Sequence, residues 1–147
     1  MHNPSFLSVN GNFQFGNPAL AEGTNAGTIK TVAATVVSIN GLMYSKAITD
    51  NIAVTACAVQ ADLTTCMYLV TMETDGDIVV TKGTEQLTGS GKDLLWPTIP
   101  ANSAVLGAIK VVTSGATFTA GTTDLGAGTV TDTYYNYFTP PTFVLQA

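Results

Sequence analysis

Residues 35–47, TVVSINGLMYSKA, give the clearest structural signal in the chain. Strand-forming residues with branched or aromatic side chains lie on both sides of Asn40-Gly41. This dipeptide is typical of the two-residue turn of a β-hairpin, because both of its residues tolerate a positive φ angle. The stretch therefore predicts two antiparallel strands joined by a tight turn.

The same arrangement around a turn dipeptide occurs twice more: in residues 66–83, CMYLVTMETDGDIVVTKG, around Asp75-Gly76, and in residues 106–121, LGAIKVVTSGATFTAG, around Ser114-Gly115. Little of the sequence is compatible with an α-helix. Only residues 58–66, AVQADLTTC, have a composition that allows one or two helical turns. We predict an all-β fold, either a β-sandwich or a jelly-roll-like barrel of about eight short strands in hairpins.

The predicted β domain covers residues 35–136, between an extended N-terminal arm, 1–34, and a C-terminal tail, 137–147. The arm is rich in asparagine, glycine and proline, which break regular structure, yet it carries three phenylalanines: Phe6, Phe13 and Phe15. We expect these rings to lie either on another molecule or on the protein's own domain.

The C-terminal stretch TYYNYFTPPTFVLQA is strongly aromatic. Its rings belong to Tyr134, Tyr135, Tyr137, Phe138 and Phe143. The prolines Pro140-Pro141 prevent a central strand. An exposed tail this apolar favours contact with a partner. The same rings would also suit the protein's own core or, with Trp96, a platform on which a sugar stacks.

The chain has few charges for its length. Charged residues make up 10% of its 147 residues and apolar residues 46%, whereas about 25% of a typical soluble domain is charged. Five lysines and ten acidic residues give a net charge of -5, and there is no arginine. Nucleic-acid binding is not expected, because it needs clustered basic side chains. Threonine is frequent instead, and on a strand it offers a neutral hydroxyl group to solvent.

The sequence predicts neither a membrane span nor an export signal. The apolar-rich runs, residues 32–39 and 52–59, are about eight residues long, whereas a spanning helix needs about 20. The N-terminal residues lack the basic segment followed by an apolar one that is typical of a secretory signal. We expect a soluble protein made in the cytoplasm, with no membrane contact.

No residue pattern predicts a catalytic centre. His2 is the only histidine, so a Ser-His-Asp or Cys-His arrangement is not expected. Two carboxylate pairs have the chemistry of an acid and a base: Asp75 with Asp77, and Asp124 with Asp132. Both pairs lie in turn-like sequence, where aspartate commonly caps backbone groups.

Metal and cofactor sites are not expected either. A calcium loop that began at Asp75 would place Val79 and Gln86 where oxygen ligands are needed. Cys57 and Cys66 are predicted to be half-buried thiols, and a zinc site would need two further ligands. We therefore predict no metal and no cofactor.

Four stretches together resemble small structural proteins of tailed-bacteriophage and prophage virions: INGLMYSKAITDNIAVTA, YLVTMETDGDIVVTKGTE, PTIPANSAVLGAIKVVT and FTAGTTDLGAGTVTDTYYN. The resemblance covers roughly residues 35–136 and neither end of the chain. It implies a place in the virion, on the head surface, after synthesis in the host cytoplasm. There the protein would act as a decoration (cement) protein that clamps subunits of the major capsid protein, often as a homotrimer, and would not be an enzyme.

Three hypotheses follow. In the first, the chain is a decoration protein that binds the assembled head and copies of itself through aromatic residues near its two ends: Phe6, Phe13, Phe15, Tyr134, Tyr135, Tyr137, Phe138 and Phe143. The alternative is a tail, fibre or head-fibre module in which Trp96 and the tyrosines bind cell-surface glycans. The third is an enzyme that uses Asp124 and Asp132.

Overall fold

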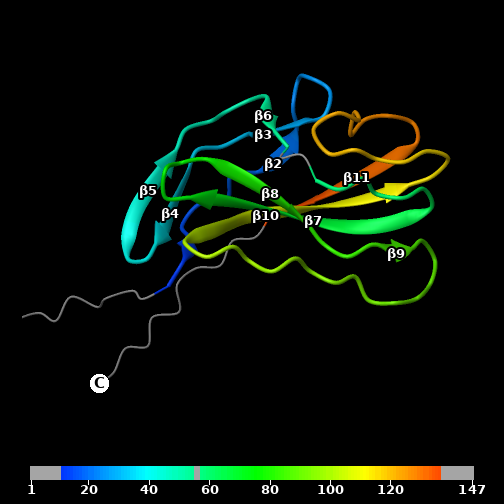
Figure 1. The fold of residues 1–147 in the computed structure, drawn as a ribbon. Coiled ribbons are helices and arrows are strands. Elements are labelled where there is room, and N and C mark those ends of the chain that lie inside the picture. Colours follow the sequence, from blue (N-terminus) through cyan, green and yellow to red (C-terminus); the bar gives the residue numbers. More distant parts are fainter. Residues whose placement is uncertain (1–10, 55–56, 137–147) are drawn as a thin grey trace, which may run out of the picture.

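The computed structural model of the chain describes residues 11–54 and 57–136. These residues form β-structure and no helix, and hence none that could cross a bilayer. The all-β prediction is confirmed. The strands labelled in Figure 1 are β1 (Phe13–Gln14), β2 (Leu20–Glu22), β3 (Thr28–Thr31), β4 (Thr35–Ile39), β5 (Leu42–Lys46), β6 (Ile52–Ala53), β7 (Thr64–Glu73), β8 (Ile78–Lys82), β9 (Gln86–Leu87), β10 (Ser103–Thr113) and β11 (Val130–Tyr135).

The strands form three antiparallel sheets. The large sheet has the order β11-β10-β7-β8, with β9 paired to the start of β7, and the smaller sheets have the orders β1-β4-β5 and β2-β3-β6. In Figure 1 the β2-β3-β6 sheet and the loop between β10 and β11 lie over one face of the large sheet, and β4 and β5 lie at its end. This arrangement is sandwich-like, and in the described part of the chain the sheets do not close into a barrel.

Two of the three predicted hairpins are confirmed. β4 pairs with β5, and the turn residues Asn40 and Gly41 have φ angles of 52° and 80°. Positive φ at both positions is the signature of the type I′ turn that such a dipeptide favours. β7 pairs with β8 around the second predicted turn, where Gly76 has a φ angle of 88°.

The predicted hairpin at Ser114-Gly115 is wrong. β10 ends just before this dipeptide, but its partner is β11, which begins only at Val130. The intervening loop folds over the sheet and buries the side chains of Phe118 and Leu125. A local turn signal shows where a strand ends, but it does not determine how many residues separate that strand from its pairing partner.

Three further expectations differ from the structure. Residues 64–66, expected in a short helical segment, begin β7. The long strands β7 and β10, with ten and eleven residues, replace some of the short strands expected. In the predicted arm, residues 11–34 contain β1, β2 and β3, which pair with one another and with β4 and β6. This part of the chain therefore belongs to the β domain, and residues 1–10 and 137–147 lie outside the described residues.

The centre of the fold is the pair of long strands β7 and β10. In β7 the side chains that join the core cluster occupy alternate positions from Cys66 to Met72. The core positions of β10 are even before an irregularity in the register and odd after it: Ala104, Leu106, Ile109 and Val111. This β-bulge shifts the alternation by one residue. Both halves of β10 therefore present apolar side chains to the same layer.

Gly107 lies at this bulge, opposite Val70. A β-carbon on Gly107 would lie 2.6 Å from the carbonyl oxygen of Tyr135 and 2.7 Å from Cδ1 of Leu20. Real β-carbons do not approach other atoms so closely. Glycine is thus required here because β11 and β2 both come into contact with this point of β10.

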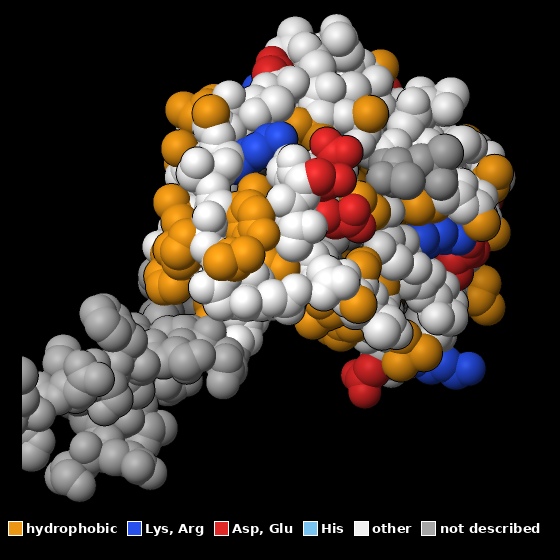
Figure 2. Space-filling view, turned by 60° about the vertical axis from the view of Figure 1, so that its left-hand side comes forward, with side chains coloured by type: hydrophobic (Ala, Val, Ile, Leu, Met, Phe, Trp, Pro, Cys, Tyr) orange, Lys and Arg blue, Asp and Glu red, His pale blue; other side chains and the backbone are white. Residues whose placement is uncertain are grey.

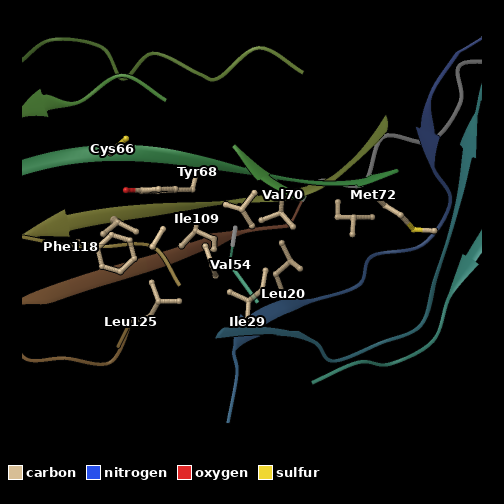
Figure 3. Packing of buried hydrophobic residues seen from close by; sticks show 14 of the residues in the cluster. Leu20, Ile29, Val54, Cys66, Tyr68, Val70, Met72, Ile109, Phe118 and Leu125 are labelled. Atoms are coloured by element: carbon tan, nitrogen blue, oxygen red, sulfur yellow. The ribbon is translucent and has the colours of Figure 1, made fainter. Parts of the chain in front are cut away.

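The core lies between the large sheet and the layer above it, as Figure 3 shows. Leu20, Ile29 and Val54 come from β2, β3 and the residues after β6, and they face the large sheet. Phe118 packs edge-on against Tyr68, with ring centroids 5.7 Å apart and ring planes at 78°. Burying each large side chain of this kind contributes about 1.5–3 kcal/mol, so the short sheet and the long loop are essential parts of the core.

Gln60 is fully buried and connects the two layers. Its backbone exchanges hydrogen bonds with the backbone of Phe118 at 2.8 and 3.1 Å. Its Nε2 donates to the carbonyl oxygens of Thr64 and Val111, and its Oε1 accepts a hydrogen bond from the Tyr68 hydroxyl. Both polar atoms of the side-chain amide have partners, which is the condition for burying such a group at little cost.

Several threonines are buried, although we expected their hydroxyl groups to face solvent. The Thr113 hydroxyl donates to the carbonyl oxygen of Ala61 at 2.7 Å and accepts a hydrogen bond from the backbone N–H of Thr64 at 3.0 Å. The Thr35 hydroxyl donates to the carbonyl oxygen of Gly16. These hydroxyls satisfy interior backbone groups near strand ends without adding charge.

The substitution Gly107→Ala is expected to lower the free energy of unfolding by about 1–3 kcal/mol, the usual cost of forcing a methyl group into a packed core. Gly128→Ala is the control, because no atom lies within 4 Å of the position its β-carbon would take. Urea denaturation of both variants measures the difference. Equal stability of the two would contradict the close approach at Gly107.

Candidate functional site

An apolar groove lies on the outer face of the large sheet, opposite the core. Its floor is formed by Leu69 of β7 and Val105 of β10, and one wall by Phe13 of β1. The other wall is the segment 96–99, WPTI. The groove has a volume of ≈ 560 Å³, which lies within the range of about 300–1,000 Å³ that is usual for ligand sites.

One side-chain hydrogen bond and one backbone bridge hold the walls of the groove in place. The Nδ2 group of Asn12, next to β1, donates to the carbonyl oxygen of Ser103 at 2.7 Å. The loop that carries segment 96–99 is joined to the end of β8 by an isolated bridge between Thr84 and Leu95. Because both walls are tied to strands of the protein, the groove is a built feature of the fold.

The groove offers few polar groups to a ligand. Gln14 is buried beside it, and its Nε2 donates to the carbonyl oxygen of Gly16 at 2.6 Å. The Oε1 atom of Gln14 has no hydrogen-bond partner among the described residues. Trp96 and Ile99 are 51% and 56% exposed. Such a surface suits an uncharged, mainly apolar ligand, because a charged group would lose hydration without gaining a counter-charge.

A second apolar surface lies on the β4–β5 hairpin. We define the hairpin patch as Val36, Leu42 and Met43, which are 38%, 63% and 59% exposed. Val36 and Met43 lie on one face of the hairpin and Leu42 on the other, so the patch covers both faces of the strand β5 near the turn. Figure 2 shows hydrophobic side chains gathered over this end of the molecule, with few charged side chains among them. Among the described strands β5 pairs only with β4, so it is an edge strand. Exposed edges of this kind can pair with another chain.

The structure places four of the eight aromatic residues that the sequence suggested as contacts. Phe13 and Phe15 are half-buried in and next to β1, and Phe13 lines the groove. Tyr134 packs against the core, whereas Tyr135 points to the opposite face and is 37% exposed. The other four lie outside the described residues: Phe6, Tyr137, Phe138 and Phe143. The groove thus brings together Phe13 and Trp96, whose sequence context indicated only a possible sugar platform for Trp96.

Sequence reasoning missed the hairpin patch and the Ile99 side of the groove. One signal was available. Leu42 and Met43 are consecutive apolar residues of one strand, and consecutive side chains of a strand point to opposite faces. One of the two therefore had to face away from the core. No comparable signal marks Ile99, because only the path of its loop brings it to the sheet.

Glu22, Asp124 and Asp132 form a small acidic cluster at the surface. A side-chain hydrogen bond with Asp124, together with partial burial and the negative charges of both aspartates, raises the pKa of Glu22. The backbone N–H of Gly126 donates to Glu22 Oε1 at 2.7 Å. The structure thus brings the predicted pair Asp124 and Asp132 together around a third acid. Among the described residues, no group of histidine, cysteine or acidic side chains is arranged to hold a metal ion.

The remaining sequence candidates have structural roles. In the β7–β8 turn, Asp75 Oδ1 accepts a hydrogen bond from the backbone N–H of Asp77 at 3.0 Å. Cys57 is half-buried, as predicted, but Cys66 is fully buried. Burial raises the pKa of the Cys66 thiol to about 11. At neutral pH this thiol is protonated and therefore a poor nucleophile.

Removing one charge from the acidic cluster should stabilise the fold at neutral pH. Because the pKa of Glu22 is raised in the folded state, the cluster favours folding at low pH, and this contribution is lost as the pH rises through that pKa. Asp132→Asn is expected to raise the free energy of unfolding at pH 7 by up to about 0.5 kcal/mol, since the cluster is largely exposed.

The gain from Asp132→Asn should disappear in acid, where the carboxyl groups are protonated in both proteins. Urea denaturation at a series of pH values measures it. The control is Asp93→Asn, at an exposed aspartate in the loop between β9 and β10. A loss of stability at pH 7 in the Asp132 variant, with none in the control, would contradict the repulsion.

No protein-family model, curated protein or solved structure matches this chain. A role for the molecule must therefore be inferred from its own surfaces, such as the groove and the hairpin patch. Both are suited to binding an uncharged, apolar surface.

Proposed function

We propose that this chain is a non-enzymatic structural protein of a tailed-phage virion, which binds the assembled head and copies of itself as a decoration protein. The observation that carries the proposal is the hairpin patch. Three large apolar side chains, at Val36, Leu42 and Met43, are exposed on an edge hairpin. Apolar side chains exposed on both faces of an edge strand are typical of a surface that another protein covers.

The composition of the chain supports the same role. Only 10% of its residues are charged. The surface around the patch can therefore be covered by a partner without burying many charged groups that lack a counter-charge. The sequence also resembles virion structural proteins over residues 35–136, which favours a capsid lattice as the partner. On a lattice, weak contacts are repeated at many equivalent positions.

The proposed function is thermodynamic. A protein that binds the assembled lattice but not the free capsid subunits stabilises the lattice by mass action. Several linked copies would bind more tightly than one, since each contact after the first is made at a high effective concentration. A homotrimer on the head surface, as the resemblance implies, would have this advantage.

The double substitution Leu42→Ser with Met43→Ser tests the hairpin patch. Burying one such side chain contributes about 1.5–3 kcal/mol, and 1.4 kcal/mol corresponds to a tenfold change in affinity. We therefore expect binding to assembled heads to weaken at least about tenfold. Co-sedimentation with heads of the phage that encodes this chain, prepared without the protein, measures the affinity.

Leu87→Ser is the matched control, because Leu87 is 68% exposed but lies on β9, away from the hairpin. It should bind as the unmodified protein does. A separate deletion is confined to residues 1–10 and tests Phe6, since β1 and β2 begin soon after and are parts of the fold. No binding of the unmodified protein to assembled heads would refute the proposal.

Glycan binding is a second candidate, because Trp96 is half-exposed on the wall of a groove. Indole rings so placed can stack on the apolar face of a sugar. Binding on a glycan array that is lost in Trp96→Ala, but kept in the hairpin variant, would favour this role over head decoration.

A further inference from the structure

We propose that the C-terminal residues 137–147 of the same chain, YFTPPTFVLQA, fill the apolar groove. Nothing among the described residues covers the outer side of this groove, where Trp96 and Ile99 are each more than half exposed. The inference is independent of the proposed role in a virion. It depends on three properties: where the last strand ends, which side the chain leaves from, and what the segment is made of.

The last strand, β11, ends close to the groove. Tyr135 is paired with Ala108, and Ala108 is paired with Leu69 of the groove floor. Neighbouring strands lie about 4.8 Å apart, so the end of β11 lies about 10 Å from Leu69. Residues directly opposite one another share a face of the sheet, so Tyr135 points to the same side as the groove.

Asn136 sets the direction in which the chain leaves the sheet. Its Oδ1 accepts a hydrogen bond from the backbone N–H of Leu20 at 2.7 Å, on the core side. The side chain of Tyr135, one residue earlier, points to the groove side of the sheet. The eleven residues that follow Asn136 would span about 34 Å in a polyproline II conformation, at 3.1 Å per residue. This length is about three times the distance to the groove floor.

The chemistry of the segment matches that of the groove. Residues 137–147 contain no charged side chain, and the groove provides no charged group. Pro140-Pro141 favour an extended conformation that loses little entropy on binding, and segments of this kind bind in grooves lined by aromatic rings. Phe13 and Trp96 supply such rings in the lining of the groove.

Tethering favours the chain's own segment over other occupants. A segment joined to its site by a short connection has an effective concentration of about millimolar, far above that of a second copy in dilute solution. The inference assigns Tyr137, Phe138 and Phe143 to contacts within the chain. Contacts with other molecules are then left to the hairpin patch and to the N-terminal residues.

Trp96 is the only tryptophan of the chain, so its fluorescence reports directly on the groove. A variant that ends at Asn136 should show a red-shifted emission and stronger quenching by acrylamide than the full chain, because the indole becomes more hydrated. Adding the synthetic peptide YFTPPTFVLQA should reverse both changes and should saturate. Circular dichroism checks that the shortened protein is folded.

A full-length variant avoids the truncation altogether. Pro140→Ala with Pro141→Ala and Phe143→Ser should move the emission in the same direction, whereas Phe6→Ser, the matched control, should not. Unchanged emission and quenching in both the shortened and the substituted proteins would overturn the inference. A shift caused instead by deleting residues 1–10 would do the same.

Dilution distinguishes the chain's own segment from that of a neighbour. Contact within one chain predicts that Trp96 emission is independent of protein concentration and that the free protein can be monomeric. Emission that shifts to the red on dilution, together with a fall in mass by light scattering, would mean that a second copy supplies the segment, and the assignment to the same chain would be overturned. Failure to bind phage heads would bear on the proposed function alone.

Discussion

The pairing of β7 with β10 is the constraint on which the rest of the structure depends. A β-bulge near Gly107 keeps apolar residues on the same face along the whole of β10. Without this shift of one residue, half of the strand would turn its apolar side chains to the outside. The bulge also brings β2 and β11 into contact with one point, which only glycine can occupy.

The second layer is held by polar contacts as well as by apolar packing. Gln60 joins the loop between β10 and β11 to the large sheet, and its side-chain amide is fully used in hydrogen bonds. Buried threonines such as Thr113 perform a similar task at strand ends. This partly explains why a protein with few charges is so rich in hydroxyl groups. Some of these groups form hydrogen bonds with backbone groups in the interior instead of facing solvent.

The same large sheet has a different task on each face. Its inner face carries the core, and its outer face forms the floor of the groove at Leu69 and Val105. The hairpin patch lies on a separate sheet at the end of the molecule. The groove and the hairpin patch are therefore separate apolar surfaces, so the groove can be filled from within the chain while the hairpin patch remains for a partner.

The sequence alone determined what depends on near neighbours. Turn dipeptides such as Asn40-Gly41 and the alternation of residues in β7 specified strands, tight hairpins and the all-β class, because φ preferences and side-chain alternation act over a few residues. Tertiary structure decided what depends on distant partners. Three features depend on packing between segments that are far apart in the chain. They are the long loop between β10 and β11, the pairing of residues 11–34 in the sheets, and the proximity of Phe13 and Trp96. Local sequence cannot encode such contacts, because which surfaces meet is settled only when the whole core is closed.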